Sequence, residues 1–218
     1  MIQRPLDHRQ TIIRAWHGSP KWERGIEIRP HSKSRTETGY GFCMTTSADR
    51  ALKYAGRNGR VILVEMEALS GLEDRRKISL AEVWKFLYEH TSKKKAKLVF
   101  DDIARLIAAT QLIRPTEDTM IDPIMLSNMC LFHQALKDQN QVELVLWLSM
   151  IGIDAEVIPQ SNQEDWIVLY NTSKVIRETV MRPNGKDGPL NDFPTISKQM
   201  SASTNYDNAV ESIEEPCL

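Results

Sequence analysis

Strand-forming segments lie at the two ends of residues 1–182, and helix-forming segments lie between them. The strand-forming segments are rich in β-branched and aromatic residues, and they cover residues 11–17, 39–46, 61–66, 154–158 and 166–171. In the block between them, Leu, Ile, Val, Phe and Met recur every three or four positions in 79–91, 97–113, 123–138 and 141–151. Because the strands bracket the helices instead of alternating with them, the pattern predicts an α+β fold.

The length and charge pattern predict one domain with a tail. At 218 residues the chain is long enough for one domain, which we place at residues 1–182 with a helical insert at about 75–140. Residues 183–218 hold two basic and six acidic residues, a net charge of −4, in a turn-rich sequence. Such a composition favours a disordered acidic tail, or one that folds only on a partner.

Metal and membrane signals are weak. The three cysteines, Cys43, Cys130 and Cys217, are far apart, so neither a disulfide framework nor a thiolate zinc site is indicated, and no metal is expected. The first ten residues lack the apolar stretch of a signal peptide. The longest nearly apolar run, 144–153, is much shorter than the ~20 residues of a membrane span. We therefore expect a cytoplasmic protein without a membrane partner.

Three segments carry residues suited to chemistry. In AWHGSP, His17 ends a predicted strand and Gly18 follows, leaving backbone groups open to a ligand, although a lone histidine at a strand end is more often a structural hydrogen bonder. In GYGFCMTTSADRALKYA, two glycines lead a short strand, and a Thr-Thr-Ser run either caps the next helix or contacts a ligand. In NQEDWIVLYN, Glu164 and Asp165 open a strand on opposite faces, so only one of them can point into a given site.

The order of these three segments resembles the ADP-ribosyltransferase superfamily, in the His–Tyr–Glu branch of diphtheria toxin and the poly(ADP-ribose) polymerases. The similarity is greatest to small bacterial and phage-borne members and covers about residues 11–66 and 142–176. The helices between residues 79 and 138 have no counterpart, although this superfamily is known for variable helical inserts. The resemblance implies a split β-sheet core with the helical insert between the third strand and the last strands.

The resemblance also implies a site for NAD as substrate. His17 would bind ribose, the Gly18 backbone would pair with the nicotinamide carboxamide, and Asp165 or Glu164 would be the catalytic acid, with Asp165 favoured because it adjoins the strand. The family's stacking aromatic is replaced by Cys43, so Tyr40 or Tyr54 would have to stack on nicotinamide. The full set expected around NAD is His17, Gly18, Ser19, Tyr40, Gly41, Cys43, Thr45 and Tyr54.

The expected function is NAD-dependent mono-ADP-ribosylation of a macromolecule by a toxin or phage-conflict effector. NAD would be cleaved at the nicotinamide–ribose bond through an oxocarbenium-like state. A cognate antitoxin or inhibitor protein would be a further partner. Two alternatives stay open: a catalytically degenerate binding module, which Cys43 favours, and an RNA 2′-phosphotransferase, which would need further arginines and histidines near the ribose.

A basic stretch bears on the acceptor, which could be RNA, DNA or protein. Residues 75–97 hold eight basic and two acidic residues, including Lys93, Lys94 and Lys95. Lysine clusters of this kind bind phosphates or are simply solvated. If the stretch lies beside the NAD site, it favours a nucleic acid, and RNA above the others.

Overall fold

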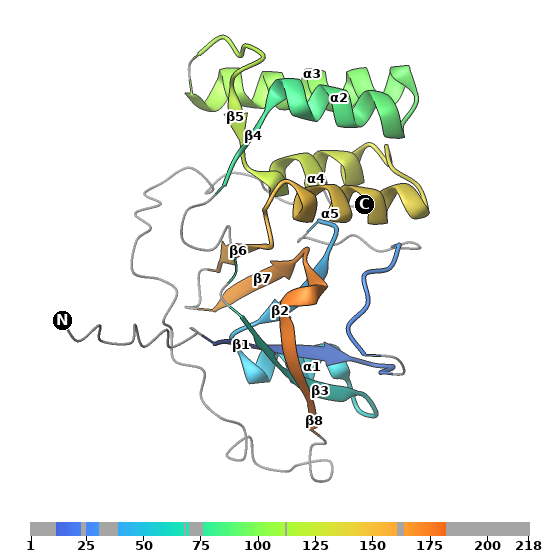
Figure 1. Cartoon of the computed structure of the whole chain (residues 1–218), viewed down its shortest axis with the longest axis vertical. Coiled ribbons are helices and arrows are strands. Elements are labelled where there is room, and N and C mark those ends of the chain that lie inside the picture. Colours follow the sequence, from blue (N-terminus) through green and yellow to red (C-terminus); the bar gives the residue numbers. More distant parts are fainter. Residues whose placement is uncertain are drawn as a thin grey trace, which may run out of the picture.

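The computed structural model describes residues 12–22, 25–30, 39–67, 69, 76–111, 113–160 and 164–181. The predicted acidic tail at 183–218 lies outside the described residues. Within them the chain folds into a six-stranded antiparallel sheet and a block of helices (Figure 1). The predicted α+β class is therefore confirmed. No helix of the described part is long and apolar enough to cross a membrane.

The sheet contains strands from both ends of the domain. Its order is β6-β7-β2-β1-β3-β8, and every neighbouring pair is antiparallel. The strands are β1 (Ile13–Ser19), β2 (Phe42–Thr45), β3 (Arg60–Met66), β6 (Ala155–Pro159), β7 (Asp165–Leu169) and β8 (Val175–Met181). A 3₁₀ turn at Thr172–Lys174 leads into β8. The three segments singled out in the sequence thus become neighbouring strands.

The sheet is nearly divided between β1 and β2. Strand β3 pairs with β1 along its whole length, and β7 pairs with β2 along its whole length. Between β1 and β2, in contrast, the register is confined to Trp16 opposite Thr45. The sheet therefore consists of two three-stranded halves, β6-β7-β2 and β1-β3-β8, which meet at one point.

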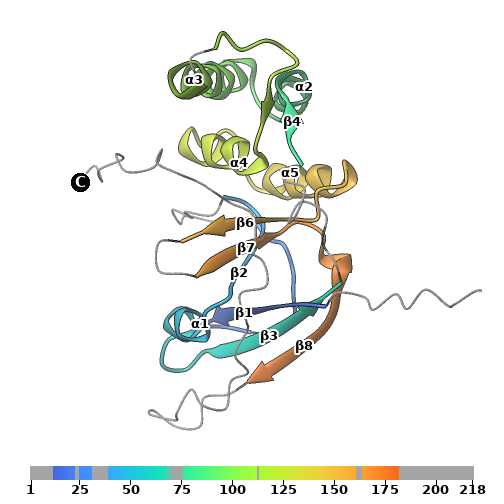
Figure 2. The same cartoon turned by 90° about the vertical axis from the view of Figure 1, so that its left-hand side faces the viewer.

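The helical block lies between β3 and β6 in the chain and covers one half of the sheet. Helices α4 and α5 lie over β6 and β7, and α2 and α3 form an outer layer above them (Figures 1 and 2). The elements are β4 (Ile78–Ser79), α2 (Leu80–His90), α3 (Lys93–Gln111), β5 (Met120–Ile121), α4 (Pro123–Phe132) and α5 (Gln139–Met150). The helices extend about ten residues beyond the expected end of the insert at 140.

Helix α1 (Ala48–Ala55) covers the other half of the sheet on the same face. Its buried residues Ala51 and Ala55 pack against Trp16, Val61 and Leu63. The Ser47 side chain caps the helix by accepting a hydrogen bond from the Arg50 backbone N–H at 3.2 Å, as the sequence predicted. We call the face of the sheet beneath α1, α4 and α5 the helix face.

The opposite face of the sheet has a separate apolar core. It contains Ala15, Phe42, Met44, Ile62 and Ile167, which alternate along their strands with residues of the helix face. The segment after β1 packs on this core through the partly buried side chains of Trp22, Ile26 and Ile28. We call this side the loop face.

Candidate functional site

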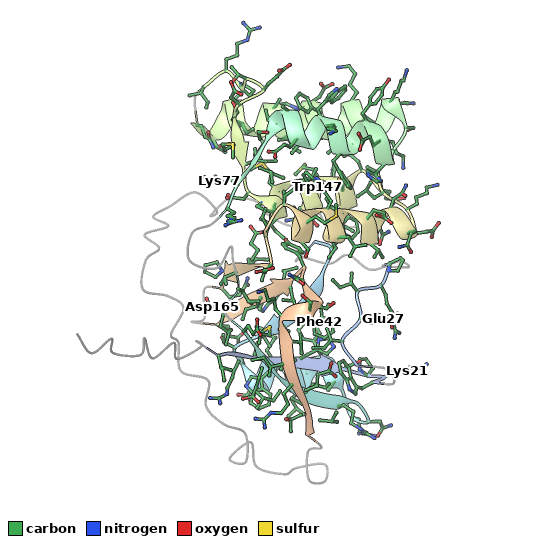
Figure 3. The ribbon with its side chains drawn as sticks, viewed as in Figure 1. Lys21, Glu27, Phe42, Lys77, Trp147 and Asp165 are labelled. Carbon is green, nitrogen blue, oxygen red and sulfur yellow. The ribbon has the colours of Figure 1, made fainter. Side chains whose placement is uncertain are left out.

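The structure brings His17 and Asp165 to neighbouring parts of the loop face. His17 shares a face of β1 with Ala15, and Asp165 shares a face of β7 with Ile167. Only β2 separates the two strands. In Figure 3, Phe42 of β2 and Asp165 lie at the level of the sheet, whereas Trp147 belongs to the helices above. Two of the three predicted catalytic residues therefore project from the same side of the sheet.

A backbone contact across the divided sheet sets the state of His17. Its Nδ1 lies 2.8 Å from the carbonyl oxygen of Cys43. Because a carbonyl can only accept, the ring proton is on Nδ1, and Nε2 carries a lone pair. Burial lowers the pKa of His17 below its ordinary value of 6.5, and the hydrogen bond to Cys43 opposes this only in part. At neutral pH, His17 is therefore a neutral ring whose Nε2 accepts hydrogen bonds.

Two aromatic side chains that the sequence analysis did not select surround His17. The Phe42 ring lies 4.3 Å from the His17 ring, centroid to centroid, at an interplanar angle of 33°. The Trp22 ring lies 5.5 Å from it at 50°. Phe42 could have been found from the sequence, since it is two residues before Met44 in β2 and therefore shares its face. Trp22 has no such signal, because it follows the strand in a turn.

The two candidate acids point to opposite faces, as strand alternation predicted. Asp165 is on the loop face and is 4% exposed. Its backbone is held by Thr46, whose Oγ1 accepts from the Asp165 N–H and whose N–H donates to the Asp165 carbonyl, both at 3.0 Å. Glu164 points toward α1, where its Oε2 lies 3.1 Å from Nε of Arg50. Asp165 is thus the acid that shares a face with His17.

Neither tyrosine proposed to stack on nicotinamide lies beside His17. Tyr40 is 2% exposed and belongs to the core beneath the helices, where burial raises the pKa of its hydroxyl. Its backbone N–H donates to Oγ of Ser127 at 2.6 Å. Tyr54 is on α1 and is 56% exposed. Both lie on the helix-face side of the sheet, away from the ring of His17.

The glycines of the predicted site have packing roles. A Cβ on Gly18 would lie 1.8 Å from the Ala51 carbonyl oxygen, so glycine allows α1 to lie directly on β1. Gly41 has a φ of 138°, and a Cβ there would lie 2.5 Å from Cγ1 of Val168. In the described residues, β2 pairs with β1 at Trp16 opposite Thr45, and it provides no strand partner for Gly18.

The remaining predicted site residues make local contacts. The Ser19 hydroxyl donates to the Lys21 carbonyl at 2.7 Å, and Thr45 Oγ1 accepts from the Ser47 N–H at 3.1 Å. Thr45 is 4% exposed, so its hydroxyl serves the turn into α1. The half-buried Cys43 side chain packs against the core beneath the helices, while its carbonyl holds His17. Cys43 therefore contributes to the site through its backbone.

The three consecutive lysines of the basic stretch do not lie beside His17 and Asp165. Lys93, Lys94 and Lys95 begin α3, which is in the outer helical layer, and α4 and α5 lie between α3 and the sheet in both views (Figures 1 and 2). Nζ of Lys93 lies 5.5 Å from the centroid of the Tyr88 ring, and the Lys95 ammonium donates to the Gln134 carbonyl. These three lysines are therefore separated from His17 and Asp165 by α4 and α5, contrary to the expectation that they border the residues proposed for NAD.

Comparisons with known proteins add little. No family model matches the chain, and no curated protein matches it. Among solved structures, one described as the crystal structure of an anti-CRISPR protein is similar, with a TM-score of 0.32 and 12% identity over 78% of this chain and 96% of that chain. At that score the similarity carries no functional argument. Within the described ranges, no three His, Cys, Asp or Glu side chains are grouped so as to hold a metal ion.

Proposed function

We propose that the protein is an NAD-dependent ADP-ribosyltransferase in which His17 binds the substrate ribose and Asp165 is the catalytic acid. The observation that carries the proposal is the placement of these two side chains on one face of two strands separated only by β2, with Glu164 turned to Arg50 on the other face. Segments far apart in the chain contribute to this arrangement. The motif resemblance is the reason for giving these two residues their roles, and their shared face supports the proposal.

The buried position of Asp165 suits the role that the proposed reaction gives it. The bond between C1′ of the ribose and the nicotinamide nitrogen would break, and its electron pair would leave with nicotinamide. The Asp165 carboxylate would stabilise the positive charge that develops on the ribose, as a fixed negative charge does in a site of low dielectric. A nucleophile of the acceptor then bonds to C1′ and releases its proton to solvent.

His17 supplies a different part of the reaction. A neutral Nε2 with a lone pair accepts a hydrogen bond from a ribose hydroxyl, and the bond from Nδ1 to Cys43 fixes the ring in this tautomer. A protonated ring would lose the acceptor and would add a positive charge next to the developing cation. The lowered pKa of His17 keeps the ring in the form that this role needs.

We propose a macromolecule as the acceptor, selected by surfaces outside the sheet. The block from α2 to α5 provides one such surface, since it rises above the strands as separate layers (Figure 2). The acceptor class is tested by incubating the protein with labelled NAD and cell extract. Label that becomes protease-sensitive identifies a protein, and label that becomes nuclease-sensitive identifies a nucleic acid.

Paired substitutions of the two acids test the proposed activity. Asp165→Asn keeps the side-chain size and removes the charge, so we expect turnover of NAD to fall by about two orders of magnitude or more. Glu164→Gln removes the charge from the partly exposed pair with Arg50 on the other face, so turnover should change by about threefold or less. Nicotinamide release is the measurement, and thermal melting checks that both variants fold.

The ranking of the two variants decides the assignment. A larger loss in Glu164→Gln than in Asp165→Asn would move the catalytic role to Glu164. Equal and mild effects in both, or a wild-type protein that neither cleaves NAD nor transfers its ADP-ribose, would overturn the proposed function.

A further inference from the structure

An aromatic surface lies beside His17 on the loop face, and its outer member is Trp22. Phe42, the inner member, is 7% exposed and is packed against His17 from β2. Trp22 follows β1 and is only partly buried, so part of its indole surface is accessible. The Trp22 and Phe42 rings meet edge to face at 6.3 Å. Of the two rings, Phe42 is thus the buried one, and Trp22 is the one with surface left exposed.

We propose that Trp22 is the side chain that contacts the nicotinamide ring of NAD. The inference rests on the proposed function and names a residue that determines how the substrate is held. The nicotinamide of NAD⁺ is a flat pyridinium with a positive charge, and tryptophan is the aromatic side chain that attracts cations most strongly. A planar indole can also stack on it.

The position of Trp22 favours contact with the nicotinamide end of NAD over the adenine end. In the proposed reaction, His17 holds the ribose that carries nicotinamide, and the ring is bonded directly to that ribose. The centroid of Trp22 lies 5.5 Å from that of His17, within the range for rings in contact, so Trp22 lies next to the residue that would hold this ribose. The adenine lies at the far end of the dinucleotide, beyond the two phosphates, and is therefore the less suitable partner.

The other aromatic candidates in the described residues lie elsewhere. Tyr40 is within the core beneath the helices, and Tyr54 is exposed on α1. Trp166 alternates with Asp165 along β7 and therefore lies on the helix face. Trp22 thus offers an accessible aromatic surface on the same side as His17 and Asp165, whereas the resemblance puts Cys43 at the position of the family's stacking aromatic.

A comparison of two ligands tests this assignment. NAD⁺ and ADP-ribose share everything except nicotinamide, and their dissociation constants can be measured by calorimetry. The full chain carrying Asp165→Asn is used so that NAD⁺ is not consumed. Adding Trp22→Ala should raise the Kd of NAD⁺ about tenfold and that of ADP-ribose by less than about twofold. Trp22→Phe should restore most of the affinity for NAD⁺.

The matched control is Trp84→Ala. Trp84 is also a partly exposed tryptophan, at 39%, but it is on α2 in the outer helical layer. Its removal should leave both dissociation constants unchanged. A parallel change with Trp84→Ala would show that the effect is not local to His17 and would overturn the assignment.

The remaining outcomes separate the two proposals. If NAD⁺ binds and Trp22→Ala leaves its Kd unchanged, the inference fails and the proposed function stands. If the Kd values of NAD⁺ and ADP-ribose rise equally in both Trp22→Ala and Trp22→Phe, Trp22 holds the fold or the adenine, and the inference also fails. If the unsubstituted protein neither binds NAD⁺ nor releases nicotinamide from it, the proposed function fails, and the inference with it.

Discussion

Three residues from two parts of the chain, β2 and the segment after β1, contact His17. The Cys43 carbonyl fixes its tautomer, Phe42 packs against its ring, and Trp22 approaches it from the segment after β1. The ring is thereby held neutral and oriented before any ligand arrives. Such an arrangement reduces the reorganisation that substrate binding requires. The buried, neutral ring also makes the protein sensitive to acid.

This acid sensitivity gives a prediction for stability. In the unfolded chain His17 titrates near its ordinary pKa of 6.5, and in the folded protein its pKa is lower. Between the two values the unfolded state binds more protons, so the contribution of His17 to stability is complete above about pH 6.5 and is lost as the pH falls below it. Replacing His17 with Gln, which cannot titrate, should make the free energy of unfolding less dependent on pH between 5 and 7.

Denaturant unfolding at several pH values measures this dependence for both proteins. A pH profile of His17→Gln that parallels the wild type would show that His17 does not titrate differently in the two states. The same profile for NAD affinity should fall with acid in the wild type, because protonated Nε2 cannot accept a hydrogen bond from ribose.

At the scale of elements, the contact between α1 and β1 is the tightest constraint on the site. Gly18 lets the backbone of the strand lie against the Ala51 carbonyl, while the side chains of Trp16 and Leu63 fill the space beside it. The helix in turn carries Arg50, which holds Glu164 at the start of β7. The position of α1 therefore affects both ends of the proposed catalytic face.

Gly18→Ala should destabilise the protein strongly. The new Cβ would lie 1.8 Å from a backbone oxygen that cannot rotate away, so α1 must shift as a unit. We expect a loss of about 3 kcal/mol or more in the free energy of unfolding, at or beyond the upper range for overpacking. Denaturant unfolding measures it.

Ser19→Ala is the control for this substitution. It changes the next residue of β1 and removes only the exposed hydrogen bond to the Lys21 carbonyl. Its cost should stay below about 1 kcal/mol. A loss for Gly18→Ala no larger than for Ser19→Ala would show that α1 can move away from β1 at little cost.

At the scale of the whole molecule, the helical block separates two kinds of surface. The face with His17 and Asp165 belongs to the sheet, whereas the lysines at the start of α3 belong to the outermost layer (Figure 1). Helices α4 and α5 lie between them (Figure 2). The two surfaces are therefore separate, and under the proposed function the outer one takes no part in cleaving NAD.

Replacing Lys93, Lys94 and Lys95 together with Gln tests this separation. Nicotinamide release should be unchanged, because the substitutions are outside the layers that form the site. If the acceptor is a nucleic acid that docks on α3, transfer of label to it should fall, and the loss should grow with salt, because each phosphate contact contributes through counterion release.

Labelling of extract at two or three salt concentrations measures the effect of the triple substitution. A loss of nicotinamide release would contradict the separation of the surfaces. Transfer that is unchanged at every salt concentration would show that these lysines form an ordinary solvated helix start.

The sequence alone was sufficient for most elements. β-branched and aromatic composition located five of the six strands of the main sheet, of which β3 and β7 are buried on both faces. The three-to-four spacing of apolar residues located all four helices of the block, because each of these buries one face. Strand β8 was not predicted from the sequence, because its charged residues interrupt the apolar pattern although they are part of the sheet. Arg177 of β8 and Arg14 of β1 both pair with the buried carboxylate of Glu65 in β3, so charges there do not indicate a loop.

Tertiary structure alone decided which residues share a site. The sequence determined that Glu164 and Asp165 point in opposite directions, since alternation is a property of a single strand. Which of them shares a face of the sheet with His17 depends on the order β7-β2-β1 and on Arg50 of α1. These are relations between strands and helices far apart in the chain. The same holds for Trp22, which reaches His17 through a turn, and for Lys93, Lys94 and Lys95, which are separated from the sheet by the packing of α4 and α5. Local pattern fixes the direction of a side chain within its own element, and long-range packing selects its neighbours.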